Sequence, residues 1–311
     1  MELKHYSVLL NESIEMLNIK KDGIYVDCTL GGGGHSSLVL SKLEKGHLYA
    51  FDQDEDAIAI ARPRLEKISK NFTIIKSNFV NLKEELLLRG IEKVDGIIFD
   101  LGVSSFQFDI PERGFSYRFD SPLDMRMDKD SLFTAKDIVN TYPMEKLAKV
   151  FFEYGEEKFS RNIAKKIVDQ RMIKPIETTF ELVDIIKSAL PAFALRKQGH
   201  PAKQVFQALR IEVNHELDYL KNALNDALSI LNKDGVVAVI TFHSLEDRIV
   251  KNIFKKATTL DLPKGLPFIP EGYEVKFQLI NKHVILPSEE ELAQNNRSHS
   301  AKLRIIERIK D

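Results

Sequence analysis

The chain is predicted to adopt a doubly wound α/β fold, in which helices cover both faces of a parallel sheet, with a helical domain inserted into it. Three observations predict this architecture. An apolar run leads into four consecutive glycines at 31–34 and then into a helical pattern. Apolar runs of strand length alternate with amphipathic stretches of helix length. That alternation stops between residues 102 and 234, and this segment is too long to be a single crossover connection between two strands.

The first 101 residues hold four expected strands and three expected helices. Each strand is a short apolar run, and each helix repeats apolar residues at helical spacing. The strands are expected at 24–30, 47–52, 72–76 and 94–101, and the helices at 36–45, 55–68 and 80–88. Parallel strands joined through helices bring their carboxyl ends to one edge of the sheet, where ligands of such folds bind.

The long interruption has a helical pattern. Helices are expected at 134–142, 144–152, 159–172 and 179–190, and one apolar stripe continues at helical spacing from 204 to 231. We therefore expect an inserted helical domain at 108–202, between a first part of the main domain at 1–107 and a second part at 203–311. The second part is expected to hold a strand at 235–242, a helix at 244–256 and two late, antiparallel strands at 274–280 and 302–309.

Composition limits the class of protein. The chain has 311 residues, 43% of them hydrophobic, and a net charge of −1, so it can bury a large core and is not uniformly basic. One cysteine excludes an intramolecular disulfide framework and fits a reducing compartment. The N-terminal residues lack an apolar signal core and no run of 18 apolar residues occurs. We therefore expect a cytoplasmic protein with no membrane partner.

The glycine run and the end of the second strand form the expected ligand-binding edge. Glycines there allow positive φ and close approach of a ligand to the backbone. Asp52 follows the glycines by roughly 20 residues, the spacing of an acid that binds ribose hydroxyls. NAD and S-adenosylmethionine both fit this geometry. Asp27 favours a cationic ligand, because a carboxylate would repel a pyrophosphate; alternatively, Asp27 binds loop amides.

Several unusual motifs occur in a specific order and narrow the choice. They are HYSVLL at 5–10, GGGGHS at 31–36, DLGVSSFQ at 100–107, ERGFS at 112–116, SPLDMRMD at 121–128, TFHSLEDR at 241–248 and RSHS at 297–300. Together they closely resemble the bacterial 16S rRNA (cytosine-N4)-methyltransferase family. The resemblance spans essentially the whole chain, and no motif of that set is missing.

The resemblance implies a class I, Rossmann-like methyltransferase that uses S-adenosylmethionine. It further implies that the enzyme methylates the exocyclic N4 of a cytidine in the decoding region of 16S rRNA, within the small ribosomal subunit. The cofactor is then expected to contact Gly33, Gly34, His35, Asp52, Phe79, Asp100 and Gln107. Without the resemblance, Phe79 would be read equally as a core residue and Gln107 as a surface residue.

Methyl transfer to an amino nitrogen requires an acceptor for its N–H, and the chain offers four candidates. Many amino-methyltransferases carry an Asp/Asn/Ser-Pro-Pro-aromatic motif after the fourth strand, and this chain has DLGV at 100–103 instead. Asp100 is the first candidate, followed by Asp124, Asp128 and His243. The structural alternatives are a salt-bridge network of the two later aspartates with Arg126, and a helix-capping role for His243.

Two other chemistries are disfavoured by the residue types present. Methylation at cytosine C5 proceeds through a cysteine adduct, and the single cysteine, Cys28, lies inside the first strand, where packing is its expected role. No metal is expected, since the eight histidines do not form ligand pairs with cysteines.

RNA binding is expected from local positive charge. Between residues 149 and 210 there are twelve Lys and Arg against seven Asp and Glu. The basic loop after 195 and a second patch from 297 to 310 are the expected RNA contacts, through Arg196, Lys197, Lys203 and Arg297. The alternative for each of these residues is that it lies on a solvent-exposed helix surface and binds no RNA. DNA is not an expected partner, and the oligomeric state stays open.

Two rival functions come from different classes. A cofactor-binding assembly factor for the small subunit would contribute by docking rather than by methylation. A nicotinamide-dependent oxidoreductase would use the same glycine turn and would bind NADH tightly.

Overall fold

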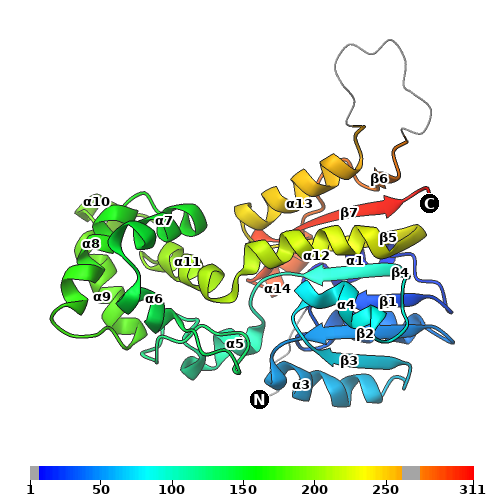
Figure 1. The fold of residues 1–311 in the computed structure, drawn as a ribbon, viewed down its shortest axis with the longest axis horizontal. Helices are drawn as coiled ribbons and strands as arrows, with labels where there is room; N and C mark the ends of the chain where they lie inside the picture. The colour runs from blue at the N-terminus through cyan, green and yellow to red at the C-terminus, as the bar shows by residue number, and fades with distance from the viewer. Residues whose placement is uncertain (1–6, 261–273) are drawn as a thin grey trace, which may run out of the picture. The chain divides into compact units, whose positions relative to one another are not determined.

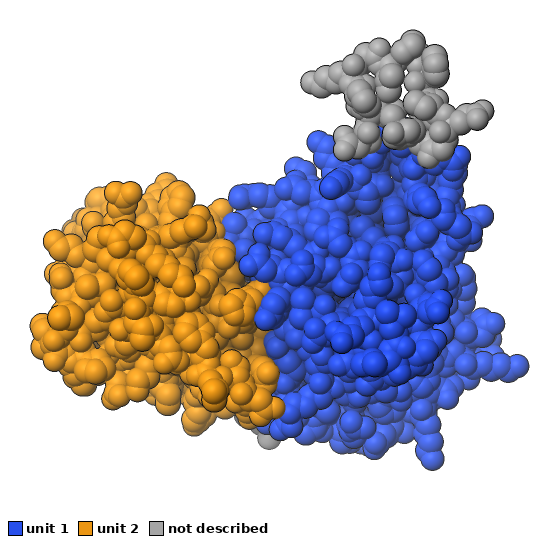
Figure 2. Space-filling model, viewed as in Figure 1, with its two compact units in different colours: residues 1–102, 217–311 blue, residues 103–216 orange. Residues whose placement is uncertain are grey.

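The computed structural model describes residues 7–260 and 274–311. The chain divides into two compact units, one formed by Met1–Gly102 with Leu217–Asp311 and the other by Val103–Glu216 (Figure 2). The sequence placed the insertion at 108–202, so the second unit begins earlier and ends later than expected. It ends later because helix α11 (Lys203–Asn214) packs against α7 (Met144–Gly155) of that unit.

The first unit is built on a seven-stranded sheet with the strand order β3-β2-β1-β4-β5-β7-β6 (Figure 1). Its strands are β1 (Ile24–Asp27), β2 (His47–Asp52), β3 (Phe72–Lys76), β4 (Val94–Asp100), β5 (Leu231–Thr241), β6 (Phe277–Leu279) and β7 (Lys302–Arg308). The first five strands pair in parallel, whereas β7 pairs antiparallel with both β5 and β6. The expected doubly wound, mostly parallel sheet with a late antiparallel pair is confirmed.

Helices cover both faces of this sheet, as the doubly wound prediction requires. They are α1 (Leu10–Met16), α2 (Gly34–Lys42), α3 (Glu55–Glu66), α4 (Leu82–Leu87), α12 (Glu216–Ile230), α13 (Ser244–Ala257) and α14 (Glu289–Gln294), with 3₁₀ turns η1 (Phe79–Asn81) and η3 (Ser298–Ser300). Alternate strand residues enter two separate cores. One core joins the sheet to α4, α12 and α13, and the other joins it to α1, α2 and α3.

The second unit is helical, as expected. It contains α5 (Ser105–Asp109), η2 (Pro111–Arg113), α6 (Ala135–Thr141), α7, α8 (Ser160–Arg171), α9 (Thr179–Ala189), α10 (Ala192–Leu195) and α11. Thr134 and Thr178 begin α6 and α9 with reciprocal capping boxes. The apolar faces of α6, α7, α8, α9 and α11 enclose one core of its own.

The single helical stripe expected from 204 to 231 is wrong: the structure has two helices there. His215 adopts a left-handed conformation with φ of 51° and ends α11. The side chain of Asn214 donates to the carbonyl of Met125 and accepts from the N–H of Met127, both at 2.8 Å. These bonds hold the end of α11 within the second unit. Hydrophobic spacing continues through the break because α12 presents its own apolar face to the sheet.

The expected strand bounds differ from the observed ones mainly at their ends. Strands β2 and β3 coincide with the prediction, β1 and β4 each end at their aspartate, and β5 begins earlier, at Leu231. Residues 5 and 6 of the N-terminal motif lie outside the described residues. Among the described residues, no helix has the length and hydropathy to span a bilayer.

Candidate active site

The glycine turn joins β1 to α2 and is shaped by packing within the protein. Gly31 and Gly33 have φ of 47° and 75°, values that favour glycine. A Cβ on Gly33 would also lie 3.2 Å from the Cβ of Ala61. Gly34 has no such φ, but a Cβ there would lie 1.8 Å from Ser7 Oγ. The N-terminal segment therefore packs on the glycine turn, which the sequence did not indicate.

Asp52 stands at the carboxyl end of β2 and fixes the glycine turn. Its Oδ2 accepts from the N–H of Gly31 at 2.8 Å, and its Oδ1 accepts from the N–H of Asp54 at 2.9 Å. Burial raises the pKa of Asp52 to about 6, against the lowering effect of these two bonds. Each carboxylate oxygen can accept more than one hydrogen bond, so Asp52 keeps lone pairs for ligand hydroxyls.

Asp27 is a buried anchor for the loop. Its Oδ1 accepts from the N–H of Thr29 at 3.0 Å, and its Oδ2 accepts from Ser36 Oγ at 2.7 Å. Burial raises the pKa of this carboxyl. The alternative reading of Asp27, a carboxylate bound to loop amides, is therefore what the structure shows. Its charge still contributes to the electrostatics of the site.

Asp100 ends β4 beside His35. Its backbone N–H donates to Thr29 Oγ1 at 2.7 Å, and its Oδ2 lies 3.5 Å from His35 Nδ1. Oδ1 is buried and has no hydrogen-bond partner among the described residues. Burial, followed by repulsion from Asp27, Glu246 and Glu291, raises the pKa of Asp100 well above its ordinary value. A buried acceptor without a donor marks the place where a ligand N–H or O–H would be stabilised.

The ends of β2 and β3 add an aromatic ring and two amides, Gln53 after β2 and Asn78 and Phe79 after β3. Phe79 packs edge-on against Phe99 at 5.7 Å between centroids and borders the sheet core. Asn78 donates from its side-chain amide to Gln53 Oε1 at 2.8 Å. Nothing in the sequence indicated the hydrogen bond between Asn78 and Gln53. In the sequence, Gln53 follows Asp52 and Asn78 precedes Phe79, and this bond joins the segments that follow β2 and β3.

His243 caps α13, as the structural alternative proposed. Its Nδ1 accepts from the N–H of Glu246, and Glu246 Oε2 accepts from the N–H of His243 in return. His243 Nε2 lies 3.0 Å from Glu246 Oε1. A catalytic role for His243 stays a prediction.

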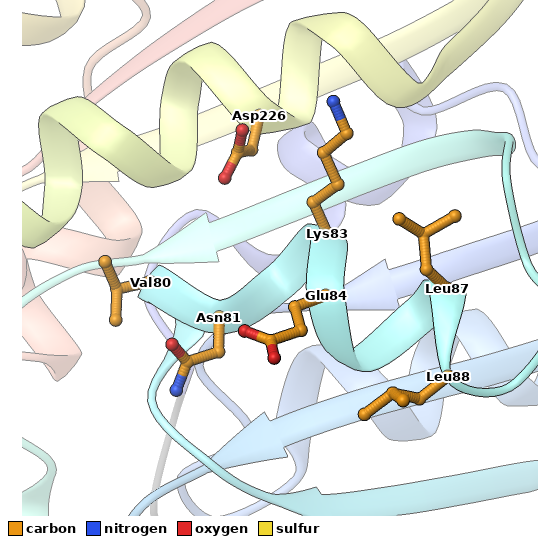
Figure 3. A pocket seen from close by; sticks show the side chains of 7 residues that line it. All are labelled: Val80, Asn81, Lys83, Glu84, Leu87, Leu88 and Asp226. Atoms are coloured by element: carbon orange, nitrogen blue, oxygen red, sulfur yellow. The ribbon is translucent and has the colours of Figure 1, made fainter.

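A surface groove of about 500 Å³ lies between α4 and α12, away from these groups (Figure 3). It is lined by Val80, Asn81, Lys83, Glu84, Leu87, Leu88 and Asp226. None of the predicted site residues lines it.

Gln107 belongs to the second unit and is buried there. Its side-chain Oε1 accepts from the backbone N–H of Ser104 at 3.1 Å, and its backbone N–H donates to Ser104 Oγ at 3.3 Å. This reciprocal pair closes the start of α5. The expectation that Gln107 contacts the cofactor stays a prediction.

Asp124 and Asp128 also belong to the second unit, where they organise a loop. Asp124 binds Arg126 with both oxygens, Oδ1 at 2.8 Å from Nε and Oδ2 at 2.7 Å from Nη2. Although burial acts to raise it, these bonds hold the pKa of Asp124 below its ordinary value. Asp128 Oδ1 accepts from the N–H of Asp130 at 2.9 Å. The expected salt-bridge alternative is present for Asp124, and catalysis by either aspartate stays a prediction.

The motifs at 112–116 and 121–128 are interlocked through backbone contacts. Buried Arg113 donates from Nη2 to the carbonyls of Arg126 at 2.8 Å and Met127 at 3.1 Å. A Cβ on Gly114 would lie 2.3 Å from the carbonyl oxygen of Pro122. These family motifs therefore build the loop itself.

The predicted RNA contacts are exposed on both units. Arg196, Lys197 and Lys203 on the second unit have no carboxylate within ion-pair distance among the described residues. Arg297 is exposed on the first unit. The basic patch that follows Arg297 is largely neutralised, because Arg304 donates to Asp247 at 2.7 Å and Lys302 lies 3.5 Å from the same carboxylate. The stronger positive surface is therefore the loop around 196.

Comparison with known proteins decides the family. The sequence model of the MraW methylase family matches residues 2–309. The chain belongs to the MraW methylase family. This match confirms the family assignment made from the motifs and makes the chain a methylase.

One curated relative of this MraW-family chain is "Ribosomal RNA small subunit methyltransferase H" of Streptococcus dysgalactiae subsp. equisimilis, 58% identical over 312 residues and covering 99% of each chain. Two solved structures are also similar. An rRNA methylase from Streptococcus thermophilus is 14% identical, with a TM-score of 0.42 and coverage of 96% of this chain and 93% of that one. A SAM-dependent O-methyltransferase from Thermotoga maritima is 10% identical, with a TM-score of 0.42 and coverage of 100% and 70%.

Cys28 is excluded as a nucleophile of this methylase. It is buried in the sheet core, and burial raises the pKa of its thiol well above the ordinary value. A covalent cysteine adduct therefore has no support in the structure.

Proposed function

We propose that this MraW-family methylase transfers the methyl group of S-adenosylmethionine to the exocyclic N4 of a cytidine in the decoding region of 16S rRNA. Family membership supports methyl transfer, and the name of the 58% identical relative supports small-subunit rRNA as the substrate. The motif set from 5–10 to 297–300 supports cytidine N4. The observation that carries the site is the buried, unpartnered Oδ1 of Asp100 beside the glycine turn.

The residues at the sheet edge fit S-adenosylmethionine. Its sulfonium and ammonium groups are positive, and the buried carboxyl of Asp27 together with the half-buried carboxyls of Asp52 and Asp100 favours a positive ligand. Asp52 retains lone pairs for the ribose hydroxyls, and Phe79 offers an apolar ring after β3. A pyrophosphate would meet the same carboxylates unfavourably, which argues against the nicotinamide alternative. The cofactor, when bound, supplies an electrophilic methyl group.

The protein then has to position the nucleophile and accept an N–H. Methyl transfer is an in-line displacement, so orientation of the amino nitrogen against the methyl group supplies most of the acceleration. Asp100 is the best acceptor, since its Oδ1 is available, whereas Asp124 already uses both oxygens on Arg126. Acceptance of the N4–H by Asp100 would concentrate the nitrogen lone pair for attack.

Binding of the rRNA rests on the second unit and on Arg297. Arg196 and Lys197 lie in an exposed loop, and Lys203 begins α11. Arg196, Lys197 and Lys203 have no carboxylate within ion-pair distance among the described residues, so they are available to RNA phosphates, whose neutralisation releases counterions. Structured RNA is recognised mainly by shape and phosphate positions, so the target base has to be unstacked to reach the cofactor.

The test is methyl transfer from labelled S-adenosylmethionine to small ribosomal subunits, followed by nucleoside mass spectrometry. N4-methylcytidine that is lost in Asp100→Ala, which removes the acceptor, is the expected result. Asp95→Asn, on the same strand at its opposite end, is the control and should retain activity. Label on another nucleoside would refute the N4 assignment. Tight cofactor binding without any label would favour the assembly-factor alternative.

A further inference from the structure

A buried histidine is held against Asp100 in one orientation. His35, in the first turn of α2, is only 3% exposed, and its Nε2 lies 3.2 Å from the carbonyl oxygen of Val8. A carbonyl only accepts, so Nε2 carries the proton and donates it to Val8. The other ring nitrogen, Nδ1, then faces Asp100 Oδ2 at 3.5 Å.

A proton on either group would stabilise that contact. A neutral ring with its proton on Nε2 presents a lone pair at Nδ1, and an ionised carboxylate presents lone pairs at Oδ2. Two facing lone pairs repel, while the bond from the Asp100 backbone N–H to Thr29 Oγ1 at 2.7 Å fixes the end of β4 beside the ring. One added proton, on either atom, converts this repulsion into an attraction.

The surrounding charges favour retention of that proton. Asp27 from β1, Glu246 from α13 and Glu291 from α14 all act on Asp100, and each raises the cost of a negative charge there. Glu291 also accepts from the N–H of Leu9 at 3.0 Å, which secures the segment whose Val8 carbonyl holds His35. Carboxylates from three elements therefore bias the pair toward one shared proton.

We propose that His35 and Asp100 share one proton between Nδ1 and Oδ2, and that His35 is thereby a positioning residue that reserves Asp100 Oδ1 as an acceptor for a ligand N–H. This inference rests on the proposed function for the identity of that ligand. The shared proton lies either on Asp100 Oδ2, next to a neutral imidazole, or on His35 Nδ1, next to an ionised carboxylate. In both states Oδ1 carries no proton and remains an acceptor. Asp100 can thus receive a nitrogen donor without an unpaired negative charge.

The donor is an N–H of either the cofactor's amino group or the target base, and kinetics distinguishes them. His35→Gln keeps a donor toward Val8 but cannot share the proton. If the cofactor supplies the N–H, this variant weakens S-adenosylmethionine binding by about tenfold or more, the worth of one hydrogen bond to a charged group. If the target base supplies the N–H, cofactor affinity is unchanged and kcat falls. The acidic limb of the pH profile of kcat then also changes. Unchanged affinity, kcat and pH profile would overturn the proposal.

A measurement without turnover separates this inference from the proposed function. Nitrogen-15 NMR of the histidine rings reports which ring nitrogen carries a proton. His35 should show a protonated Nε2 and a partly protonated Nδ1 near neutral pH, and Nδ1 should lose its proton in Asp100→Asn. His47, whose Nε2 contacts Thr73 Oγ1 at 2.9 Å on β2, is the internal control and should not change. Identical His35 signals in both proteins would refute the shared proton even if rRNA methylation were established.

Discussion

Replacement of Gly34 by alanine should destabilise the protein through one neighbour, Ser7. A Cβ at this position would lie 1.8 Å from Ser7 Oγ and 3.0 Å from Ser7 Cβ. Rotation of the hydroxyl relieves only the first contact, so the N-terminal segment itself must move. Overpacking of this kind costs about 1–3 kcal/mol. Gly34 is the first residue of α2, and alanine there recovers about 0.5–1 kcal/mol of helix propensity.

The structure therefore predicts a large coupling between positions 7 and 34. Gly34→Ala alone should lower the free energy of unfolding, whereas the same change in a Ser7→Gly background should raise it by about 0.5–1 kcal/mol. Urea denaturation of the wild type, both single variants and the double variant measures this coupling, expected at about 1–3 kcal/mol.

Gly33→Ala is the matched control for the steric argument. Its φ of 75° is strained for alanine, and its nearest neighbour is Ala61 rather than Ser7. The cost of Gly33→Ala should therefore be equal in both backgrounds. If Gly34→Ala also costs the same in both, within about 0.5 kcal/mol, the packing of Ser7 on the glycine turn is refuted.

Three further outcomes follow from the site and the second unit. The pKa of Asp52 is about 6, so cofactor affinity should rise with pH up to about 6 and level off above it, as followed by calorimetry. Since this folded-state pKa is raised, the contribution of Asp52 to stability should fall between about pH 4 and 6, and Asp52→Asn should remove both dependences. Arg113→Met should destabilise the second unit by about 2–4 kcal/mol in urea, because two carbonyls lose their buried donor. Reversal of charge at Arg196 and Lys197 should weaken binding to small subunits and lower its salt slope by about 1 for each lost phosphate contact.

Each of these outcomes has a control in the chain. Asp56→Asn, at a half-buried aspartate in the first turn of α3, should leave the pH dependence of cofactor affinity intact. Arg118→Met, at an exposed arginine of the same unit, should leave the unfolding midpoint unchanged. Charge reversal at Lys42, exposed on α2, should leave the salt slope unchanged. A pH-independent affinity, an Arg113 variant of wild-type stability, or equal salt slopes in all variants would contradict the corresponding argument.

Sequence reasoning succeeded where a local pattern determines the structure. The apolar runs of β2 and β3 are bounded by polar residues, and their ends were located from the sequence alone. Asp52 was correctly placed beside the glycine turn because its distance from the glycines is fixed by one strand-helix-strand unit. Chain direction then placed Asp100 at the same edge, since parallel strands carry their carboxyl ends together.

Sequence reasoning failed where contacts join distant segments. Ser7 lies where a Cβ on Gly34 would stand, and nothing in the local pattern signals such a neighbour. The contact of His35 with Val8 and Asp100 joins three segments and could not be predicted from spacing. The break at His215 was hidden because α11 and α12 bury apolar faces against different cores with continuous periodicity. The sequence signal for this break is the pair Asn214 and His215 in the middle of the apolar repeat, since asparagine and histidine are poor helix formers.

The strand order of the sheet has a consequence for folding during translation. Strand β5 lies between β4 and β7, yet it is synthesised only after the whole of Val103–Glu216 has been made. During translation β4 therefore waits with one open edge while the helical unit, which is continuous in sequence, is completed. Its local helix contacts allow it to fold first, and the long-range pairing of β4 with β5 follows. Until then the open edge of β4 presents unpaired backbone N–H and C=O groups that can pair with another strand.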